Sequence, residues 1–404
     1  MQRYREFAED KFMSSVTPLT SQAEHPALAP TTHDEFARQE FVRSYKQYLV
    51  KNVHGTNQLA YERRVKPKIE REKKRPPKDR FEVRDAMVQD PHYQMFSALL
   101  RTSQEMMWSS CQIPVQRELE TLNKKINKKR AKPRGALRLD PKLETPRYHT
   151  SVDIHCQPGG YHSEFADSDA SAGMVYDRAV HIYAMGQMGP YNNDIGASIA
   201  LWVKENYPTF KPLRILDLGC SVGHSTVPYV DAFPKAEIHA VDVAAPMLRY
   251  AHARAEELGK KIHFSQQNAE SMDFEDESFD LIVSHILLHE TSDKAIRNII
   301  KECNRLLKKG GLMVHAETPQ YKGMDPFDAF MLDWDTRNNN EPFWARSHEI
   351  DLKKLSKQAG FSVSRHIETL IPSAFQIAEA KRSLTFQGGD FGGGGFWFIY
   401  GSEK

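Results

Sequence analysis

Two carboxylates and two glycines stand close together within residues 213–242, in types and spacing suited to holding a ligand. Asp217 ends an apolar run, and Gly219 and Gly223 form a turn directly after it. Glycine lets the backbone bend sharply and come within contact distance of a bound molecule. Asp242 ends the next apolar run, where a carboxylate can accept charge-assisted hydrogen bonds from both hydroxyls of a ribose. The segment therefore predicts a binding site for a ligand that carries a nucleoside.

The turn differs from the dinucleotide pattern G-x-G-x-x-G, because Ser221 and His224 stand at the positions of its second and third glycines. A carboxylate at Asp217 would repel a pyrophosphate but suits a ligand with an ammonium and a sulfonium group. The stretch Asp-x-Gly-x-x-x-Gly resembles the first motif of the class I S-adenosylmethionine-dependent methyltransferases. The alternative interpretation is a Rossmann-like unit that binds another ligand or none.

Apolar runs and helical patterns alternate from residue 213 to the end of the chain. This alternation predicts an α/β fold with a mostly parallel sheet and one antiparallel strand near its edge. The resemblance adds a Rossmann-like sheet of seven strands, expected at residues 215–218, 237–241, 262–265, 278–284, 312–317, 361–367 and 396–400. Ligands of such sheets bind at the carboxyl ends of the strands, where the strand order reverses. We therefore expect Asp217, Asp242, Asn268 and Ser284 around one crevice.

The resemblance covers about residues 195–404. Within the family, the sequence resembles the ubiquinone and menaquinone biosynthesis type, whose members mostly methylate small molecules. Asn268-Ala269 resembles the short motif that contacts the adenine, although aspartate is more common at position 268. Ser221 likewise stands where a third glycine is common. The resemblance implies S-adenosyl-L-methionine as the cofactor, bound by Asp217, Gly219, Cys220, Gly223, Asp242, Val243, Met247, Asn268, Ala269 and Ser284.

Two histidines after the fourth expected strand are the candidate catalytic residues. His285 and His289 stand on the side where an acceptor would enter, and their spacing brings them to a similar face if the segment is helical. His289 is the candidate general base for a hydroxyl or ammonium acceptor, and the alternative is a packing residue at a helix start. Beyond a base, methyl transfer mainly requires in-line alignment with the acceptor atom. The four cysteines form no C-x-x-C pair, so we expect free thiols and no metal site.

The chain before residue 213 carries no cofactor motif and is expected to be mainly helical. Residues 1–150 form an N-terminal extension that acts as a lid, as a dimerisation element or in acceptor binding. Residues 151–212 form a helical lead-in that covers the cofactor. Residues 213–404 form the catalytic domain, which carries an insertion at about 318–347.

Aromatic residues in two of these parts are candidates for covering the ligands. Tyr176, Tyr183 and Tyr191 of the lead-in are candidate lid residues, and ordinary packing residues are the alternative that we favour. The insertion combines aromatic and polar side chains, which is typical of a small-molecule pocket. Its candidates for an acceptor pocket are Asp333, Trp334, Asp335, Asn338, Asn339 and Trp344.

Composition and charge limit the classes of partner. The 404 residues carry a net charge of +2, and no stretch is apolar enough for a signal sequence or a membrane span, so we expect a cytoplasmic protein. Two basic runs, residues 62–80 and 124–134, could dock nucleic acid but contain interspersed acids or solvated helix ends. We therefore favour a small-molecule acceptor, with a homodimer left open. The alternatives are an RNA or protein methyltransferase and a non-enzymatic binding module.

Overall fold

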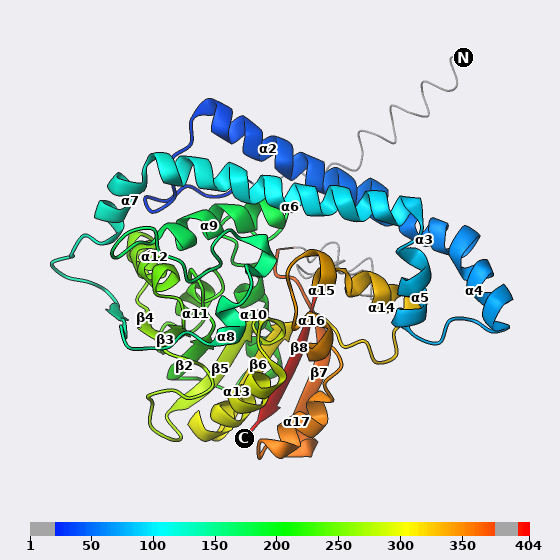
Figure 1. Cartoon of the computed structure of the whole chain (residues 1–404). Helices are drawn as coiled ribbons and strands as arrows, with labels where there is room; N and C mark the ends of the chain where they lie inside the picture. Colours follow the sequence, from blue (N-terminus) through cyan, green and yellow to red (C-terminus); the bar gives the residue numbers. More distant parts are fainter. Residues whose placement is uncertain (1–20, 376–394) are drawn as a thin grey trace, which may run out of the picture.

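The computed structural model describes residues 21–375 and 395–404. A layer of helices lies over a domain of α/β fold (Figure 1). This architecture confirms the predicted fold class and the mainly helical N-terminal region. The first twenty residues of the expected extension lie outside the described ranges. Within those ranges, no helix combines the length and the apolar character that crossing a membrane requires.

Within the described residues, eight strands form one sheet in the order β1-β4-β3-β2-β5-β6-β8-β7. All neighbouring strands are parallel except that β8 runs antiparallel to both β6 and β7, which confirms the single antiparallel strand. The order reverses between β2 and β5, so the switch point of the sheet lies there. The strand bounds are β1 Ala136–Arg138, β2 Arg214–Leu218, β3 Glu237–Asp242, β4 His263–Gln266, β5 Phe279–His285, β6 Leu307–Glu317, β7 His366–Pro372 and β8 Phe396–Glu403.

The predicted count of seven strands is wrong by one, because β1 from the N-terminal region pairs in parallel with β4. A strand of three residues carries too little periodicity to be recognised in a sequence. The expected strand at 361–367 is also displaced, since residues 363–365 form a 3-10 turn and β7 starts at His366. β6 begins at Leu307, before the start of the expected strand at 312–317, and it pairs with β5 in an irregular register.

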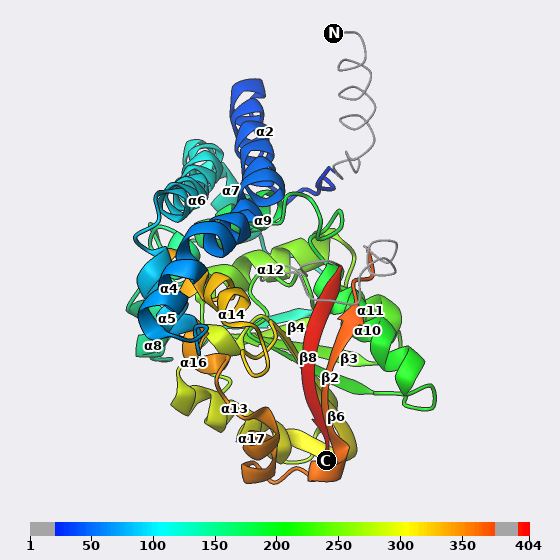
Figure 2. The same ribbon diagram turned by 90° about the vertical axis from the view of Figure 1, so that its right-hand side faces the viewer.

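Helices cover both faces of the sheet, which explains why its central strands are apolar throughout. Ile215 of β2 belongs to a buried cluster with residues of α10, α11 and α12, whereas Leu216 and Leu218 belong to a cluster with residues of α13 and α17. Figure 2 shows α10 and α11 on one side of the strands and α13 and α17 on the other. The helix bounds are α10 Asp194–Asn206, α11 Val227–Ala232, α12 Ala245–Glu257, α13 Asp293–Leu306 and α17 Leu352–Gln358.

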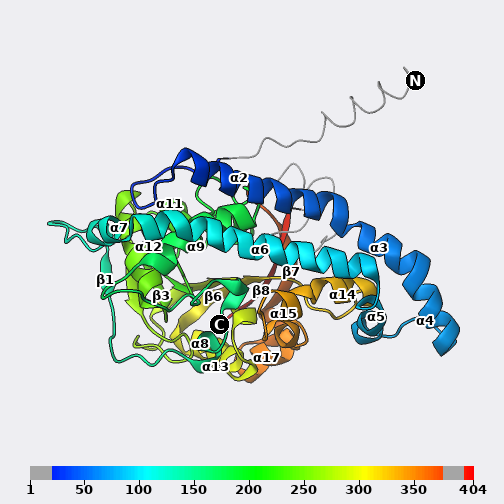
Figure 3. The same cartoon turned by 45° about the horizontal axis from the view of Figure 1, so that its top comes forward.

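The helical layer is built around two long helices, α2 and α6, which run side by side (Figures 1 and 3). Asp90 accepts a hydrogen bond from the backbone N–H of His92, and Pro91 is the first residue of α6, a position that suits proline because it needs no N–H donor. The elements of the layer are α2 His33–Tyr48, η1 Leu49–His54, α3 Thr56–Ala60, η2 Tyr61–Val65, α4 Lys66–Lys73, α5 Arg80–Met87, α6 Pro91–Arg117, α7 Leu119–Ile126, α8 Arg147–Thr150, η3 Ile154–Cys156 and α9 Ser171–Tyr183.

The segment between β6 and β7 packs against the helical layer. It contains α14 (Pro326–Leu332), α15 (Trp334–Asn338) and α16 (Trp344–Ser347). The aromatic residues of α14 and α15 form a buried cluster with residues of η2, α5 and α6. Tyr61 and Phe327 stack there with ring centroids 4.6 Å apart. This segment therefore joins the sheet-forming half of the chain to its N-terminal half.

A buried carboxylate, Asp177 of α9, connects the helical layer to the sheet domain. Its side chain is 0% exposed and lies between α12, the glycine turn and the N-terminal segment before α2. Burial alone would raise the pKa of Asp177, but Arg254 and His224 hold it well below its usual range. The carboxylate oxygens accept hydrogen bonds at 2.7–3.1 Å from the side chains of Gln22, His25, His224, Tyr250 and Arg254.

We expect Asp177→Ala to lower the free energy of unfolding by about 3–5 kcal/mol, because it leaves the buried Arg254 guanidinium without its carboxylate. Urea unfolding followed by circular dichroism measures this loss. Asp231→Ala is the control, since Asp231 pairs with Lys260 but its side chain is 64% exposed. That variant should lose no more than about 1 kcal/mol. An equal loss in the two variants would show that the layer does not depend on Asp177.

Candidate functional site

A cavity of about 180 Å³ lies at the carboxyl ends of β2, β3, β4 and β5, which is where the switch point predicts a ligand. Its sheet wall consists of Asp217, Gly219, Cys220, Ser221, Val241, Asp242, Val243, Gln267, Asn268, Ala269, His285, Ile286 and Leu287. Its helical wall includes Gln104, Met107, Trp108, Tyr148, His149, His155, Tyr161, Tyr176, Ala179, Val180 and Tyr183. The cavity thus lies between the sheet and the helical layer.

Asp242 lies at the end of β3 in this wall. One carboxylate oxygen accepts a hydrogen bond from the backbone N–H of Ser221 at 2.9 Å, and the other accepts one from Ala244 at 2.8 Å. These two bonds fix the carboxylate and leave lone pairs on both oxygens for a ligand. Burial raises the pKa of Asp242 to about 6, so the group still ionises at neutral pH.

The glycine turn after β2 requires left-handed backbone at several positions. Gly219 has φ +63°, and a Cβ there would lie 2.5 Å from Leu287 Cδ1. A side chain at Gly219 would therefore first collide with Leu287 of the cavity wall. The sequence, in contrast, suggests that the backbone at Gly219 contacts a ligand directly. Gly223 has φ +76° but does not line the cavity, and a Cβ there would meet Phe264 at an ordinary 3.5 Å. Ser221 adopts φ +49°, which is uncommon for a residue other than glycine.

Most of the other expected cofactor residues also line the cavity. Cys220, Val243, Met247, Asn268 and Ala269 all lie in its wall. Asn268 accepts a hydrogen bond from the backbone N–H of Glu270, which orients its amide.

Ser284 does not line the cavity. Its side chain is fully buried, and its hydroxyl contacts Nδ1 of His315 at 2.6 Å. The alternation of side chains along β5 explains the difference, because neighbouring residues of a strand point to opposite faces. His285, the next residue, reaches the cavity instead.

His285 is held from two sides. Its Nδ1 lies 3.1 Å from a carboxylate oxygen of Asp217, and its Nε2 contacts the hydroxyl of Tyr229 at 2.9 Å. The other oxygen of Asp217 accepts a hydrogen bond from Thr226 at 2.5 Å. Asp217 is 1% exposed, and its carboxylate is engaged by the side chains of His285 and Thr226. The carboxylate therefore orients the imidazole of His285.

His289 lies behind the cavity wall. Its side chain is 0% exposed, and its Nδ1 lies 2.7 Å from a carboxylate oxygen of Glu317. Burial disfavours an imidazolium, but Glu317 outweighs that effect and raises the pKa of His289 to about 9. An imidazole that holds its proton at neutral pH does not suit a general base. The segment after β5 is a short 3-10 turn, η4 (Leu288–Glu290), and not the α-helix that would align His289 with His285.

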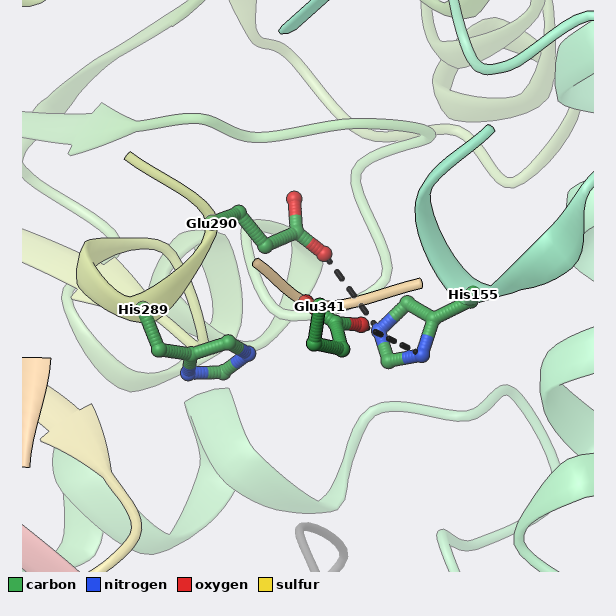
Figure 4. Close-up of side chains that lie close together, drawn as sticks. All are labelled: His155, His289, Glu290 and Glu341. Atoms are coloured by element: carbon green, nitrogen blue, oxygen red, sulfur yellow. Dashed lines mark ion pairs between the residues drawn. The ribbon is translucent and has the colours of Figure 1, made fainter. Parts of the chain in front are cut away.

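Four side chains beside the cavity form a cluster that no sequence motif brings together: His155, His289, Glu290 and Glu341 (Figure 4). One nitrogen or oxygen atom of each lies within 4.8 Å of the others. His155 Nδ1 lies 2.8 Å from a carboxylate oxygen of Glu341, and His155 Nε2 lies 3.4 Å from one of Glu290. His155 and Glu290 line the cavity. In the sequence, only His289 and Glu290 stand next to each other, so a local pattern could indicate no more than these two members of the cluster.

The structure separates the aromatic candidates into two groups. Tyr176 and Tyr183 line the cavity, whereas Tyr191 does not. The six insertion residues proposed for an acceptor pocket also lie outside the wall of this cavity. The expectation that they line the acceptor pocket is therefore wrong for this cavity. Trp334 is buried in the cluster with η2, α5 and α6, and Trp344 packs against His289 with ring centroids 4.7 Å apart. Trp108 and Tyr161 take the expected place of the tryptophans in the wall.

Residues 215–311 match the family described as Methyltransferase domain. The demethylmenaquinone methyltransferase of Lactococcus lactis subsp. lactis is 37% identical over 177 residues, which are 41% of this chain and 66% of that protein. The ubiquinone biosynthesis O-methyltransferase of Dinoroseobacter shibae is 28% identical over 208 residues, covering 49% of this chain and 81% of that protein. The uncharacterized methyltransferase YcgJ of Bacillus subtilis is 35% identical over 120 residues, 28% of this chain, and the chain spans only 45% of its length.

Among solved structures, phosphoethanolamine N-methyltransferase 2 of Haemonchus contortus, in complex with S-adenosyl-L-methionine, is similar over 56% of each chain at 15% identity. The TM-score of this match is 0.37. The family match, in contrast, spans the segment from β2 into β6, with the glycine turn and Asp242 inside it. The chain therefore contains a class I S-adenosylmethionine-dependent methyltransferase domain.

Proposed function

We propose that this protein is an enzyme that transfers the methyl group of S-adenosylmethionine to a small-molecule acceptor. The observation that carries the proposal is the cavity, which lies at the strand ends of the matched domain and is closed by aromatic side chains of the helical layer. A mostly apolar enclosure with a few convergent polar groups is typical of small-molecule sites.

The residues of the sheet wall fit S-adenosylmethionine. Asp242 offers a carboxylate with free lone pairs to the ribose, and Ser221 offers a buried hydroxyl. That hydroxyl has no hydrogen-bond partner in the part of the chain that the structure describes, so a ligand would satisfy it. Asn268 and Ala269 would contact the adenine, and the wall at Gly219 and Cys220 would face the methionine part.

When bound, S-adenosylmethionine supplies a methyl group on a sulfonium, and in-line displacement breaks the sulfur–carbon bond and forms a bond to an oxygen, nitrogen or carbon of the acceptor. The chain must then align the acceptor and exclude water. Trp108, Tyr161 and Tyr183 would cover the reacting atoms from the helical wall. We propose His285 as a positioning residue, because Asp217 and Tyr229 hold its ring in one orientation.

Two further observations favour a small acceptor over RNA or protein. The relatives above carry names that refer to demethylmenaquinone and to ubiquinone biosynthesis. Several cations of the basic runs that could dock a polyanion form ion pairs within the chain: Arg64 with Asp90, Arg75 with Glu82, Lys124 with Glu120, and Arg130 with Glu257. These pairs support the interpretation of the runs as solvated surface.

Asp242→Ala should weaken the binding of S-adenosylhomocysteine by about tenfold to a few hundredfold, because each lost charge-assisted hydrogen bond is worth about 1.5–3 kcal/mol. Isothermal titration calorimetry measures the dissociation constant. Asp273→Ala is the control, since the Asp273 side chain is 84% exposed and lies outside the cavity wall. Unchanged affinity in Asp242→Ala, or micromolar binding of NAD by the wild-type protein, would contradict the proposed cofactor.

The affinity for S-adenosylhomocysteine should also depend on pH. The pKa of Asp242 is about 6, and the ionised carboxylate is the form that accepts from the ribose. Lowering the pH from about 7 to about 5 protonates the group and should reduce the affinity by about tenfold. The same titration on Asp242→Asn should give a flat profile. A wild-type profile that is equally flat would remove Asp242 from the binding site.

Gly219→Val should abolish the binding of S-adenosylhomocysteine in a protein that still folds. The valine would occupy left-handed backbone and displace Leu287, which lines the cavity. Gly223→Ala is a matched control with the same sign of φ but ordinary contacts, so it should cost about 1–2 kcal/mol of stability and keep binding. Thermal unfolding and calorimetry separate the two effects, and normal binding by folded Gly219→Val would place the ligand elsewhere.

A further inference from the structure

We propose that His155, His289, Glu290 and Glu341 bind one divalent transition-metal ion at the wall of the cavity. Figure 4 shows the four side chains pointing toward a common centre. They come from η3, from η4 and from the loop between α15 and α16, so the site forms only when these segments pack together. The proposal departs from the expectation of a metal-free protein, which depended on the cysteine spacing alone.

Buried atoms without partners are the first argument. Among residues 21–375 and 395–404, Nε2 of His289 and one carboxylate oxygen of Glu341 have no hydrogen-bond partner, and the other oxygen of Glu341 contacts only His155 Nδ1, at 2.8 Å. The two side chains are 0% and 1% exposed, so bulk water does not satisfy these atoms either. Buried polar atoms normally have a partner, and a metal ion would be a common partner for His289 Nε2 and the Glu341 carboxylate.

The surroundings of His289 are the second argument. Its Nδ1 is engaged by Glu317, which leaves Nε2 directed to the cluster. Histidines that bind metals usually donate the N–H of the other ring nitrogen to a carboxylate, which orients the ring and raises its basicity. Glu317 is itself fixed by the backbone N–H groups of Leu287 and Leu288. This chain of contacts is the support that a metal-binding imidazole needs.

The charge balance is the third argument. Glu290, Glu317 and Glu341 bring three carboxylates into a space that contains two imidazoles, His155 and His289. Like charges that are withdrawn from water are stable only when they are paired or coordinate a cation. A divalent ion would neutralise the excess negative charge without requiring both imidazoles to be protonated.

The distances and the donor types indicate the class of ion. Bonds of about 2.0–2.2 Å place the ligand atoms of one ion about 3.0–4.4 Å apart, depending on geometry. The observed atoms lie within 4.8 Å of one another, so small side-chain rotations would close the site. Two imidazoles with two carboxylates favour Zn²⁺, Fe²⁺, Mn²⁺ or Co²⁺ over Mg²⁺ and Ca²⁺, which prefer oxygen ligands alone.

The position of the site suggests its role, which rests on the proposed methyl transfer. His155 and Glu290 line the cavity, so an open coordination position of the ion would face the acceptor. A hydroxyl bound there would lose its proton to water more readily, and a carbonyl oxygen bound there would be polarised. The acceptor would then be an oxygen-bearing molecule that binds the ion beside the atom to be methylated. By lowering the pKa of a bound hydroxyl, the ion would reduce the need for a general base from the chain.

The test uses the full chain, freed of metal with a chelator and titrated with Co²⁺ while its visible absorption is recorded. We expect one Co²⁺ per chain, displaced by Zn²⁺. Glu341→Gln and His155→Ala should each lower the affinity for Co²⁺ by more than about 100-fold, and Glu317→Gln by about 10–100-fold. His263→Ala is the control, because His263 lies on β4 outside the cluster, and it should leave the affinity unchanged.

Calorimetry with S-adenosylhomocysteine on the same samples checks folding and separates the two proposals. Normal binding of S-adenosylhomocysteine without stoichiometric Co²⁺ binding overturns the metal site and leaves the methyltransferase proposal in place. Co²⁺ binding that survives both Glu341→Gln and His155→Ala also overturns the metal site. Co²⁺ binding that depends on the cluster, in a protein that does not bind S-adenosylhomocysteine, supports the metal site and overturns the proposed function.

Discussion

The carboxylate of Asp177 is the interaction on which the arrangement of the two halves of this protein depends. It is completely buried, and it accepts hydrogen bonds from the N-terminal segment, from His224 of the glycine turn and from Arg254 of α12. A buried charge is stable only when its partners remain in place, so the helical layer and the sheet are held in one relative position. The cavity lies between these two parts, and its shape follows from that constraint.

The helical layer is for this reason part of the site. Gln22 and His25 complete the shell around Asp177, and Trp108 of α6 forms part of the cavity wall. The segment between β6 and β7 strengthens the connection through its aromatic contacts with η2, α5 and α6. The same segment supplies Glu341, so the contacts that hold the insertion also complete the cluster beside the cavity.

Adjacent residues of one strand can have different roles because their side chains point to opposite faces of the sheet. Ser284 and His285 are neighbours in β5, yet one is bonded to His315 in the core and the other lines the cavity. His289 was expected at the acceptor, but a short 3-10 turn places it behind the wall against Glu317. The spacing of two residues in the sequence predicts whether their side chains share a face only if the type of helix is known. The direction of each side chain depends on the number of residues per turn.

The sequence by itself determined the α/β fold, the glycine turn and the placement of Asp217, Gly219, Asp242 and Asn268 at one edge of the sheet. Asp217, Gly219 and Asp242 belong to a contiguous strand, turn, helix and strand, and Asn268 follows the next strand of the same alternation. The periodicity and the glycine positions that reveal these elements are local properties of the sequence. Only the tertiary structure decided that β1 joins the sheet, that Asp177 connects the two halves and that His155 and Glu341 meet Glu290. Those contacts join segments far apart in the chain, and they depend on packing that no local pattern of residues encodes.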